Sequence, residues 1–208
     1  MFIQVIQGKT NDADRLHARM DAWRDELEPG AEGWLGGTYG IDDDNEFIGV
    51  VRFDSRESAM RNSERPEQGA WWAETEKCFD GDVTFHDCDD VTMMLDGGSD
   101  DAQFVQVIQG RISDQEKFRM MRDMPMDTLH TERPDILGGT IAVDKDGWFT
   151  QTMAFRTEAE AREGEKKAMP PEVMEQMADM DKAMSDVRYH DLHHPWFATA
   201  GARAPRDV

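Results

Sequence analysis

A segment near the start of the chain returns almost unchanged in its second half. Residues 2–8 (FIQVIQG) reappear as residues 104–110 (FVQVIQG), and residues 35–38 (LGGT) reappear as residues 137–140. Both pairs are separated by 102 positions (104 minus 2, and 137 minus 35). Internal repetition constrains a fold more than any local pattern, because each repeat must form the same structural unit. The chain is therefore predicted to be a tandem duplication.

The repeat extends to the end of each half. Phe53 matches Phe155 at the same offset, and residues 83–87 (VTFHD) match residues 187–191 (VRYHD) after a shift to 104. One insertion of two residues aligns the two halves. We expect a first repeat at residues 1–95, a linker at 96–102, a second repeat at 103–199 and a tail at 200–208.

Composition excludes several classes of function. The chain has 208 residues and a formal charge of −21, which repels phosphate backbones, so nucleic-acid binding is not expected. No apolar run approaches the ~20 residues of a membrane span, and no secretory signal opens the sequence. The two cysteines show no metal-type spacing, which favours a reducing compartment. We expect a cytoplasmic protein that binds neither membrane nor nucleic acid.

The hydrophobic periodicity predicts the same order of elements in each half. In the first half we expect strands at 2–7, 33–41, 46–53 and 83–86, helices at 11–28 and from 54 or 55 to 79, and a short extra strand at 91–95. In the second half we expect strands at 103–109, 136–143, 148–155 and 186–190, and helices at 113–130, from 157, and from 171 to 184. Pro66 should interrupt or restart the second helix, and Pro125 should kink or shorten the helix at 113–130.

Each half has the predicted order strand, helix, two strands, helix and strand. This order is that of a ferredoxin-like sandwich, in which both helices lie on one face of an antiparallel sheet. The strand at 2–7 is apolar on both faces, so the second face needs a cover, and a tandem copy would provide it. The order, the glycine-rich second strand and residues 53–59 (FDSRESA) resemble the dimeric α/β-barrel superfamily, which includes the antibiotic-biosynthesis monooxygenases. We predict an α+β fold of tandem ferredoxin-like repeats packed sheet to sheet as an intrachain dimeric α/β barrel.

The resemblance also suggests functional positions. Gln4 and Gln106 match the first-strand position at which several enzymes of the superfamily place an asparagine that faces the pocket. In haem-degrading relatives, a histidine on the second helix binds iron. Trp71 stands near that position in the first half, and the second half has only Glu, Met and Gln there. We therefore predict no haem and no other cofactor.

Two histidines are candidate bases. His86 shares one face of its predicted strand with Thr84, and His190 shares the matching face with Arg188. If the opposite faces pack on the helices, both histidines face the barrel interior with Gln4. An imidazole there would remove a proton from a phenolic or enolisable substrate. The alternative is that both histidines end edge strands and contact solvent or the adjacent aspartates. The densest potential metal cluster is His190, Asp191, His193 and His194, but a strand would turn His190 and Asp191 to opposite faces, so no metal site is predicted.

Aromatic residues distinguish the first half. Trp71 and Trp72 are adjacent on the second helix, so one ring should pack inward while the other lies toward the surface or the mouth of a pocket. They would form an aromatic wall for a flat ligand, or simply part of the core. Arg52 on the third strand adds a cation. We assign Gln4, Arg52, Trp71, Trp72, Gln106 and His190 to substrate binding and His86 to catalysis.

These assignments predict a small-molecule-binding barrel. One hypothesis is a cofactor-independent, monooxygenase-like enzyme that acts on a planar aromatic or polyketide-type substrate. The other is a non-catalytic ligand carrier or interaction module with the same fold. A catalytic pocket should pair a cavity with a base, whereas a carrier needs only the cavity. We expect a monomer that contains an internal pseudo-dimer, or a homodimer, with any chemistry mainly in the first half.

Overall fold

The computed structural model describes residues 1–95, 97–122 and 131–201. They form two compact units. Unit 1 contains residues 1–86 and the segment that begins at residue 196, and unit 2 contains residues 87–195. Pro125 and the predicted tail from residue 202 lie outside the described residues. No helix among the described ranges is long and apolar enough to cross a membrane.

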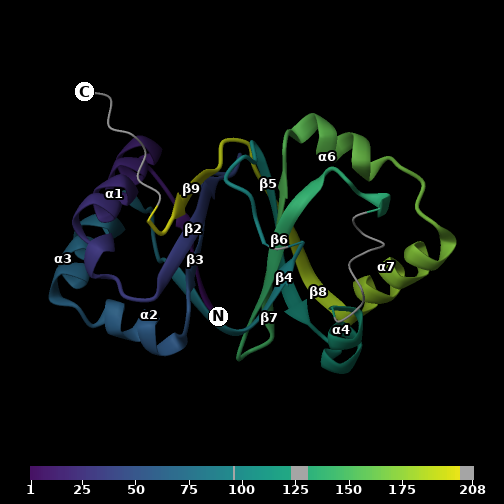
Figure 1. Cartoon of the computed structure of the whole chain (residues 1–208), viewed down its shortest axis with the longest axis horizontal. Helices are drawn as coiled ribbons and strands as arrows, with labels where there is room; N and C mark the ends of the chain where they lie inside the picture. The colour runs from purple at the N-terminus through teal and green to yellow at the C-terminus, as the bar shows by residue number, and fades with distance from the viewer. Residues whose placement is uncertain (96, 123–130, 202–208) are drawn as a thin grey trace. The chain divides into compact units, whose positions relative to one another are not determined.

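Unit 1 is a five-stranded sheet with its helices on one face (Figure 1). Its elements are β1 (Phe2–Lys9), α1 (Ala13–Glu26), η1 (Glu28–Gly30), β2 (Trp34–Ile41), β3 (Glu46–Phe53), α2 (Arg56–Ser63), α3 (Pro66–Thr75), η2 (Glu76–Cys78), the start of β4 (Thr84–Met94) and β9 (Trp196–Thr199). The strand order is β4-β1-β3-β2-β9.

Unit 2 repeats this arrangement. Its elements are the remainder of β4, β5 (Phe104–Ile112), α4 (Gln115–Arg122), β6 (Ile136–Asp144), β7 (Trp148–Phe155), α6 (Glu158–Glu165), α7 (Pro171–Ala183) and β8 (Met184–Leu192). The strand order is β8-β5-β7-β6-β4. The helices of this unit also lie on one face of its sheet (Figure 1). The α+β fold predicted from the repeat, with a ferredoxin-like unit in each half, is confirmed.

The fifth strand of each sheet comes from the chain that follows the fourth strand of the other repeat. In unit 1, Ala198 on β9 pairs with Gly37 on β2. In unit 2, Met94 on β4 pairs with Gly139 on β6. Gly37 and Gly139 are 102 positions apart and Ala198 and Met94 are 104 apart, which are the two offsets of the sequence repeat. The two repeats have therefore exchanged their last strands.

This exchange explains two differences from the expected elements. The predicted strands at 83–86 and 91–95 form the single strand β4, because its first residues pair in unit 1 and Cys88 to Met94 pair with β6. Strand β9 was not predicted at all. The compact units consequently divide the chain after His86 and again before Trp196, rather than at the expected repeat limits. Those limits stay a prediction about the duplicated unit.

Side-chain caps and a proline mark the starts of the unit 1 helices. The Asp12 carboxylate accepts from the Arg15 amide at the start of α1, and the Ser55 hydroxyl accepts from the Ser58 amide at the start of α2. Pro66 starts α3 after the short break that follows α2. A proline at the first helical position costs no hydrogen bond, because that amide has no partner inside the helix.

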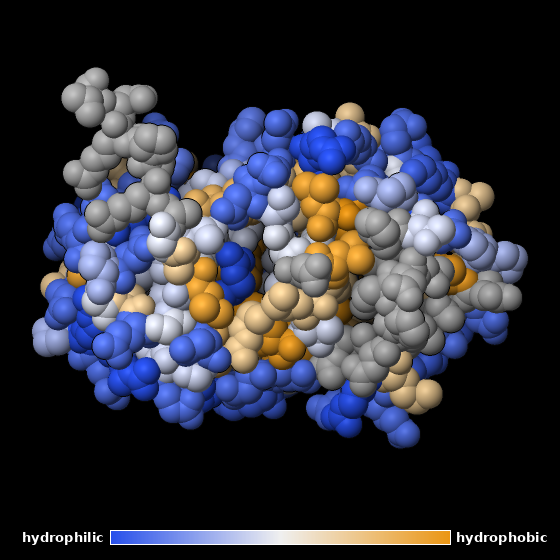
Figure 2. All heavy atoms as spheres, viewed as in Figure 1, coloured by the Kyte–Doolittle hydropathy of each residue, from blue (hydrophilic) through white to orange (hydrophobic). Residues whose placement is uncertain are grey.

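Much of the visible surface of the unit 1 helices is hydrophilic (Figure 2).

The core of unit 1 lies between its sheet and its helices. Phe2 and Ile6 on β1 pack with Leu16, Met20 and Trp23 on α1. Because strand side chains alternate, the helix-facing side of β1 also carries Gln4. In unit 2, Phe104 on β5 belongs to the corresponding cluster, with Ala161 on α6. Burial of these aromatic and aliphatic side chains is the main term that holds each sheet to its helices.

Candidate functional site

Unit 1 contains a cavity of about 70 Å³ between the sheet and the helices. Residues from β1, α1, β2, β3, α2, α3 and β9 line it, so every layer of the unit contributes. Its walls are largely aromatic, from Trp23, Trp34, Tyr39, Phe53, Trp71 and Trp196. Such a concave, mostly apolar site with a few polar groups is typical of small-molecule binding.

Trp71 is held rigidly on the helix side. Its indole nitrogen donates to the Arg19 carbonyl at 3.0 Å, and the Arg19 guanidinium donates back to the Trp71 carbonyl at 3.0 Å. The same guanidinium lies over the ring, 5.5 Å from its centroid. These contacts join α1 to α3 and leave the ring 7% exposed. Trp71 therefore forms a fixed wall of the cavity.

A chain of hydrogen bonds ties the cavity rim together. The Trp23 indole nitrogen donates to Gln68 Oε1 at 2.7 Å, and the Asn62 amide nitrogen donates to the same oxygen at 3.4 Å. Asn62 Oδ1 in turn accepts from Arg65 at 3.0 Å. These residues come from α1, α2 and α3, so the network fixes the three helices against one another beside the cavity.

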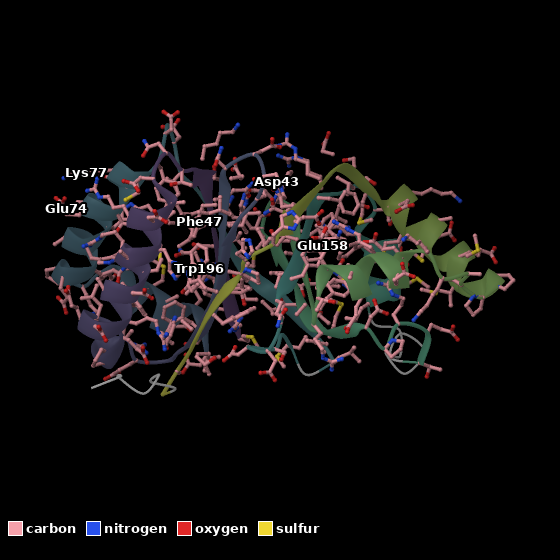
Figure 3. The ribbon with its side chains drawn as sticks, turned by 90° about the horizontal axis from the view of Figure 1, so that it is seen from above. Asp43, Phe47, Glu74, Lys77, Glu158 and Trp196 are labelled. Carbon is pink, nitrogen blue, oxygen red and sulfur yellow. The ribbon has the colours of Figure 1, made fainter. Side chains whose placement is uncertain are left out.

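Strand β9 supplies the opposite wall. Trp196 pairs with Tyr39 across β9 and β2, and their rings stack at 6.1 Å. The Trp196 ring also stacks on His17 of α1 at 4.5 Å and lies 6.1 Å from Phe47 of β3. Figure 3 shows Trp196 and Phe47 close together between the sheet and the helices of unit 1. The last strand of the chain is thus built into the first unit's site.

The glycines of the LGGT motif make room for these rings. The Tyr39 side chain lies along β2 over Gly37, where an added Cβ would stand 2.1 Å from the Tyr39 hydroxyl. Gly36 adopts φ +146°, and an added Cβ there would stand 2.5 Å from the Ala198 carbonyl of β9. Other backbone and side-chain atoms therefore approach this motif closely. This close approach allows both the tyrosine and the exchanged strand to reach the cavity.

Tyr39 is the strongly perturbed ionisable group of the cavity. Burial raises its pKa to about 12, although the nearby charges of Arg52 and Arg24 act in the opposite direction. Desolvation disfavours the phenolate, so the hydroxyl stays protonated at neutral pH. Tyr39 therefore acts as a hydrogen-bond donor in this cavity and not as a base.

The structure brings together only some of the predicted site residues of unit 1. Gln4 and Trp71 line the cavity. Trp72 contacts Phe85 instead, with ring centroids 5.1 Å apart, in a separate surface cleft of about 380 Å³. Arg52 lies on the other face of β3 from the lining residue Val51, and it donates to the Thr38 hydroxyl at 3.0 Å.

His86 and Gln4 lie on opposite faces of the unit 1 sheet. Phe85 packs on Trp72 of α3, so the alternation along β4 turns His86 away from the helices. Gln4 points toward the helices and into the cavity. The expected grouping of His86 with Gln4 is therefore not found. The error arose because β1 is apolar on both faces, which hides the side that packs on the helices.

The matching residues of unit 2 are separated in the same way. Gln106 donates to Asp191 at 3.1 Å, and Asp191 also accepts from Arg162. His190 pairs with Val107, the neighbour of Gln106 on β5, and so lies on the other sheet face. Glu158 extends the Gln106 network by accepting from Arg162 at 3.3 Å. The side-chain amide of Gln4 thus lines a cavity in unit 1, whereas that of Gln106 in unit 2 is hydrogen-bonded within a network of charged residues.

Neither a protein-family model nor a curated protein matches this chain. Solved structures match over nearly its whole length. Two are named "putative monooxygenase": one from Fusobacterium nucleatum has 9% identity and a TM-score of 0.74, covering 100% of this chain and 98% of its own. The other, from Lactobacillus acidophilus, has 13% identity and a TM-score of 0.70, with 97% of both chains covered. An anthrone oxidase-like protein has 7% identity and a TM-score of 0.68, covering 100% and 96%.

This chain has the dimeric α/β-barrel fold. The predicted fold, with two ferredoxin-like units in tandem, is confirmed. At these identities the barrel fold is what the chains share, so the substrate has to be argued from the site itself. Tyr39, Trp34 and Trp196 were missed as site residues. The position of Tyr39 directly after the LGGT motif was a usable signal, whereas Trp196 gave none, because its place depends on the strand exchange.

Proposed function

We propose that the unit 1 cavity is the ligand site of a monooxygenase-like enzyme that needs no cofactor and acts on a planar aromatic or polyketide-type substrate. The supporting observation is the aromatic enclosure itself, in which Trp23, Trp34 and Trp71 line the cavity together with the stacked pair Tyr39 and Trp196. Flat rings that are fixed by packing orient a flat ligand with little loss of entropy.

The size of the cavity implies movement on binding. A volume of about 70 Å³ is well below the roughly 300–1,000 Å³ of most ligand pockets. Strand β9 is a short edge strand, whose four residues pair with β2 on one side. Displacement of β9 would unstack Trp196 from His17 and open the site. The proposed ligand therefore enters beside β9.

A candidate reaction is the oxidation of anthrone, chosen because one protein with this fold is named for that activity. Anthrone and O₂ give anthraquinone and water: the methylene carbon loses two hydrogens and gains one oxygen atom, and the second oxygen atom leaves as water. Gln4 and Tyr39 would hold the substrate oxygen. His86 lies on the other sheet face, so the proposed reaction takes no proton through it.

A ligand carrier is the second candidate. The ionisable residues among the described cavity walls are Asp21, Arg24 and Tyr39, with no histidine among them. Asp21 is exposed, and Tyr39 has a pKa of about 12, so no buried wall residue serves as a base at neutral pH. A cavity without such a base fits transport of an aromatic ligand better than proton abstraction.

One experiment separates these candidates. Anthrone is added to the full chain while tryptophan fluorescence, O₂ consumption and anthraquinone absorbance are recorded. The enzyme predicts quenching with O₂ uptake equal to the anthraquinone formed, above the uncatalysed rate. The carrier predicts quenching alone. Absence of quenching by anthrone and by other flat aromatics would refute both.

Light scattering on the same sample tests the expected monomer or homodimer. The cytoplasmic location stays a prediction.

A further inference from the structure

Two tryptophans in the cavity wall have buried indole nitrogens without a hydrogen-bond partner among the described residues. They are Trp34 at the start of β2 and Trp196 on β9. Trp34 is only 4% exposed. Buried N–H groups are nearly always paired in native proteins. An unpaired one loses its hydrogen bond to water without gaining another, which destabilises the folded state. Two such groups in the same cavity require a common explanation.

The neighbouring polar groups already have their partners. The Trp23 indole donates to Gln68, and the Trp71 indole donates to the Arg19 carbonyl. The Ser63 hydroxyl donates to the Ala59 carbonyl. The indole nitrogens of Trp34 and Trp196 remain without a partner among the described residues, and an indole N–H can only donate. These two indole N–H groups therefore lack a hydrogen-bond acceptor.

The two indoles and the Tyr39 hydroxyl have no counterparts at the matching positions of unit 2. At the repeat offset of 102, unit 2 has Ile136 in place of Trp34 and Ile141 in place of Tyr39. Thr92 takes the place of Trp196, since Thr92 pairs with Ile141 as Trp196 pairs with Tyr39. Aliphatic residues at two of these positions show that the fold itself does not need the donors. Their presence in unit 1 is thus explained by something that binds there.

We infer that the unit 1 cavity recognises an uncharged carbonyl compound, whose oxygen atoms accept hydrogen bonds from the indole N–H groups of Trp34 and Trp196. This inference rests on the proposed function for the presence of an aromatic ligand in the cavity. It adds the polar group that the ligand must carry. A carbonyl oxygen accepts without donating, so it matches the two indole N–H groups, which only donate.

The surroundings of Tyr39 favour a neutral oxygen over a phenolate. Burial keeps the Tyr39 hydroxyl protonated, although Arg52 and Arg24 favour its anion. A phenolate of the ligand would meet the same desolvation in the same cavity. A ketone or quinone oxygen avoids that cost and can still accept two hydrogen bonds. In the free protein, water would satisfy the donors, and the ligand would displace it.

The test compares indan-1-one with indane, a pair of flat molecules that differ only in the carbonyl oxygen. Binding to the full chain is measured by calorimetry, and the carbonyl stretch is followed by isotope-edited infrared spectroscopy. We expect indan-1-one to bind roughly twofold to tenfold more tightly per hydrogen bond, with its stretch moved to lower wavenumber. Trp34→Phe and Trp196→Phe should each remove part of both effects. Trp148→Phe, in unit 2, is the matched control and should change neither.

Each outcome decides the inference. Equal affinity for the two compounds with an unshifted carbonyl band would overturn it and leave the proposed function standing. Absence of binding by either compound would overturn both. If a phenylalanine variant fails to fold, the wild-type infrared shift still decides. A parallel titration with 4-nitrophenol reports on charge: a rise in its phenolate absorbance on binding would contradict recognition of a neutral oxygen.

Discussion

Replacing Ala198 by methionine should close the unit 1 cavity. Ala198 lines the cavity and is 2% exposed. Its counterpart in unit 2 is Met94, which is 3% exposed and packs with Phe118 and Phe149. The substitution Ala198→Met thus copies the arrangement of unit 2 into unit 1. Methionine is flexible and fills irregular space, so it is well suited to the test.

The expected magnitude follows from the cavity volume. At ~24 cal/mol per Å³, removing a void of about 70 Å³ stabilises the folded protein by at most about 1.7 kcal/mol. Strain from an imperfect fit and the loss of water from the Trp34 and Trp196 indole nitrogens oppose this gain, so we expect a net increase of at most about 1 kcal/mol in the free energy of unfolding. For a chain of this size, that raises Tm by roughly 2–4 °C. Ligand binding should be lost in the same variant.

Urea unfolding and ligand titration check both halves of this prediction. The urea midpoint should rise with an unchanged slope, because the surface exposed on unfolding stays the same. Met94→Ala is the matched control: it opens a void in unit 2 and should cost about 2–5 kcal/mol without affecting ligand binding in unit 1. An Ala198→Met variant that is less stable, or that binds aromatic ligands as before, would refute the assignment of the cavity.

Three further predictions concern the chain more widely. In a Tyr189→Phe variant the remaining tyrosine, Tyr39, should form phenolate with a midpoint near pH 12. Because burial raises this pKa above the usual 10, the stability linked to the protonated hydroxyl, on the order of 3 kcal/mol, is complete below pH 10 and is lost as pH rises toward 12. Tyr39→Phe should abolish this loss when unfolding is measured across that range. Gly36→Ala should cost about 1–3 kcal/mol and weaken ligand binding, since the new Cβ would stand 2.5 Å from a β9 carbonyl; normal stability and affinity would contradict the docking of β9. Hemin should give no stoichiometric Soret shift, because α2, α3, α6 and α7 carry no histidine, and a sharp shift that persists in His86→Ala and His190→Ala would disprove this.

The order of elements could be predicted because its signals are local. Alternating apolar residues, the caps at Asp12 and Ser55 and the break before Pro66 each act within a few residues of the chain. The repeat then allowed each half to check the other. The fold followed, since strand, helix, two strands, helix and strand leave few arrangements that bury one face of a sheet.

The site could be predicted only in part, because it depends on contacts that are distant in sequence. Gln4 and Trp71 were identified from their positions in the repeat, and both line the cavity. Trp196 reaches the cavity by pairing with Tyr39, more than a hundred residues earlier, and a four-residue strand carries too little pattern to reveal its partner. Gln4 was predicted to face the barrel interior, whereas it points toward the helices. This error had a different cause: Ile3 and Val5 on the opposite face of β1 are as apolar as the residues that pack on the helices, so the sequence does not reveal which face the helices cover.

The exchanged strands explain how one copy of the site could change without the other. In a homodimer of identical units, any substitution that fills one cavity also fills its twin. After duplication, the last strand of the second repeat serves only unit 1, and the end of β4 serves only unit 2. Ala198 and Met94 could therefore diverge independently. Filling unit 2 with Met94 and the Gln106 network supplies packing there, while unit 1 keeps a cavity and its unpaired donors. Packing in unit 2 and ligand binding in unit 1 can thus be selected separately, which allows unit 1 to keep buried donors that cost stability in the absence of a ligand.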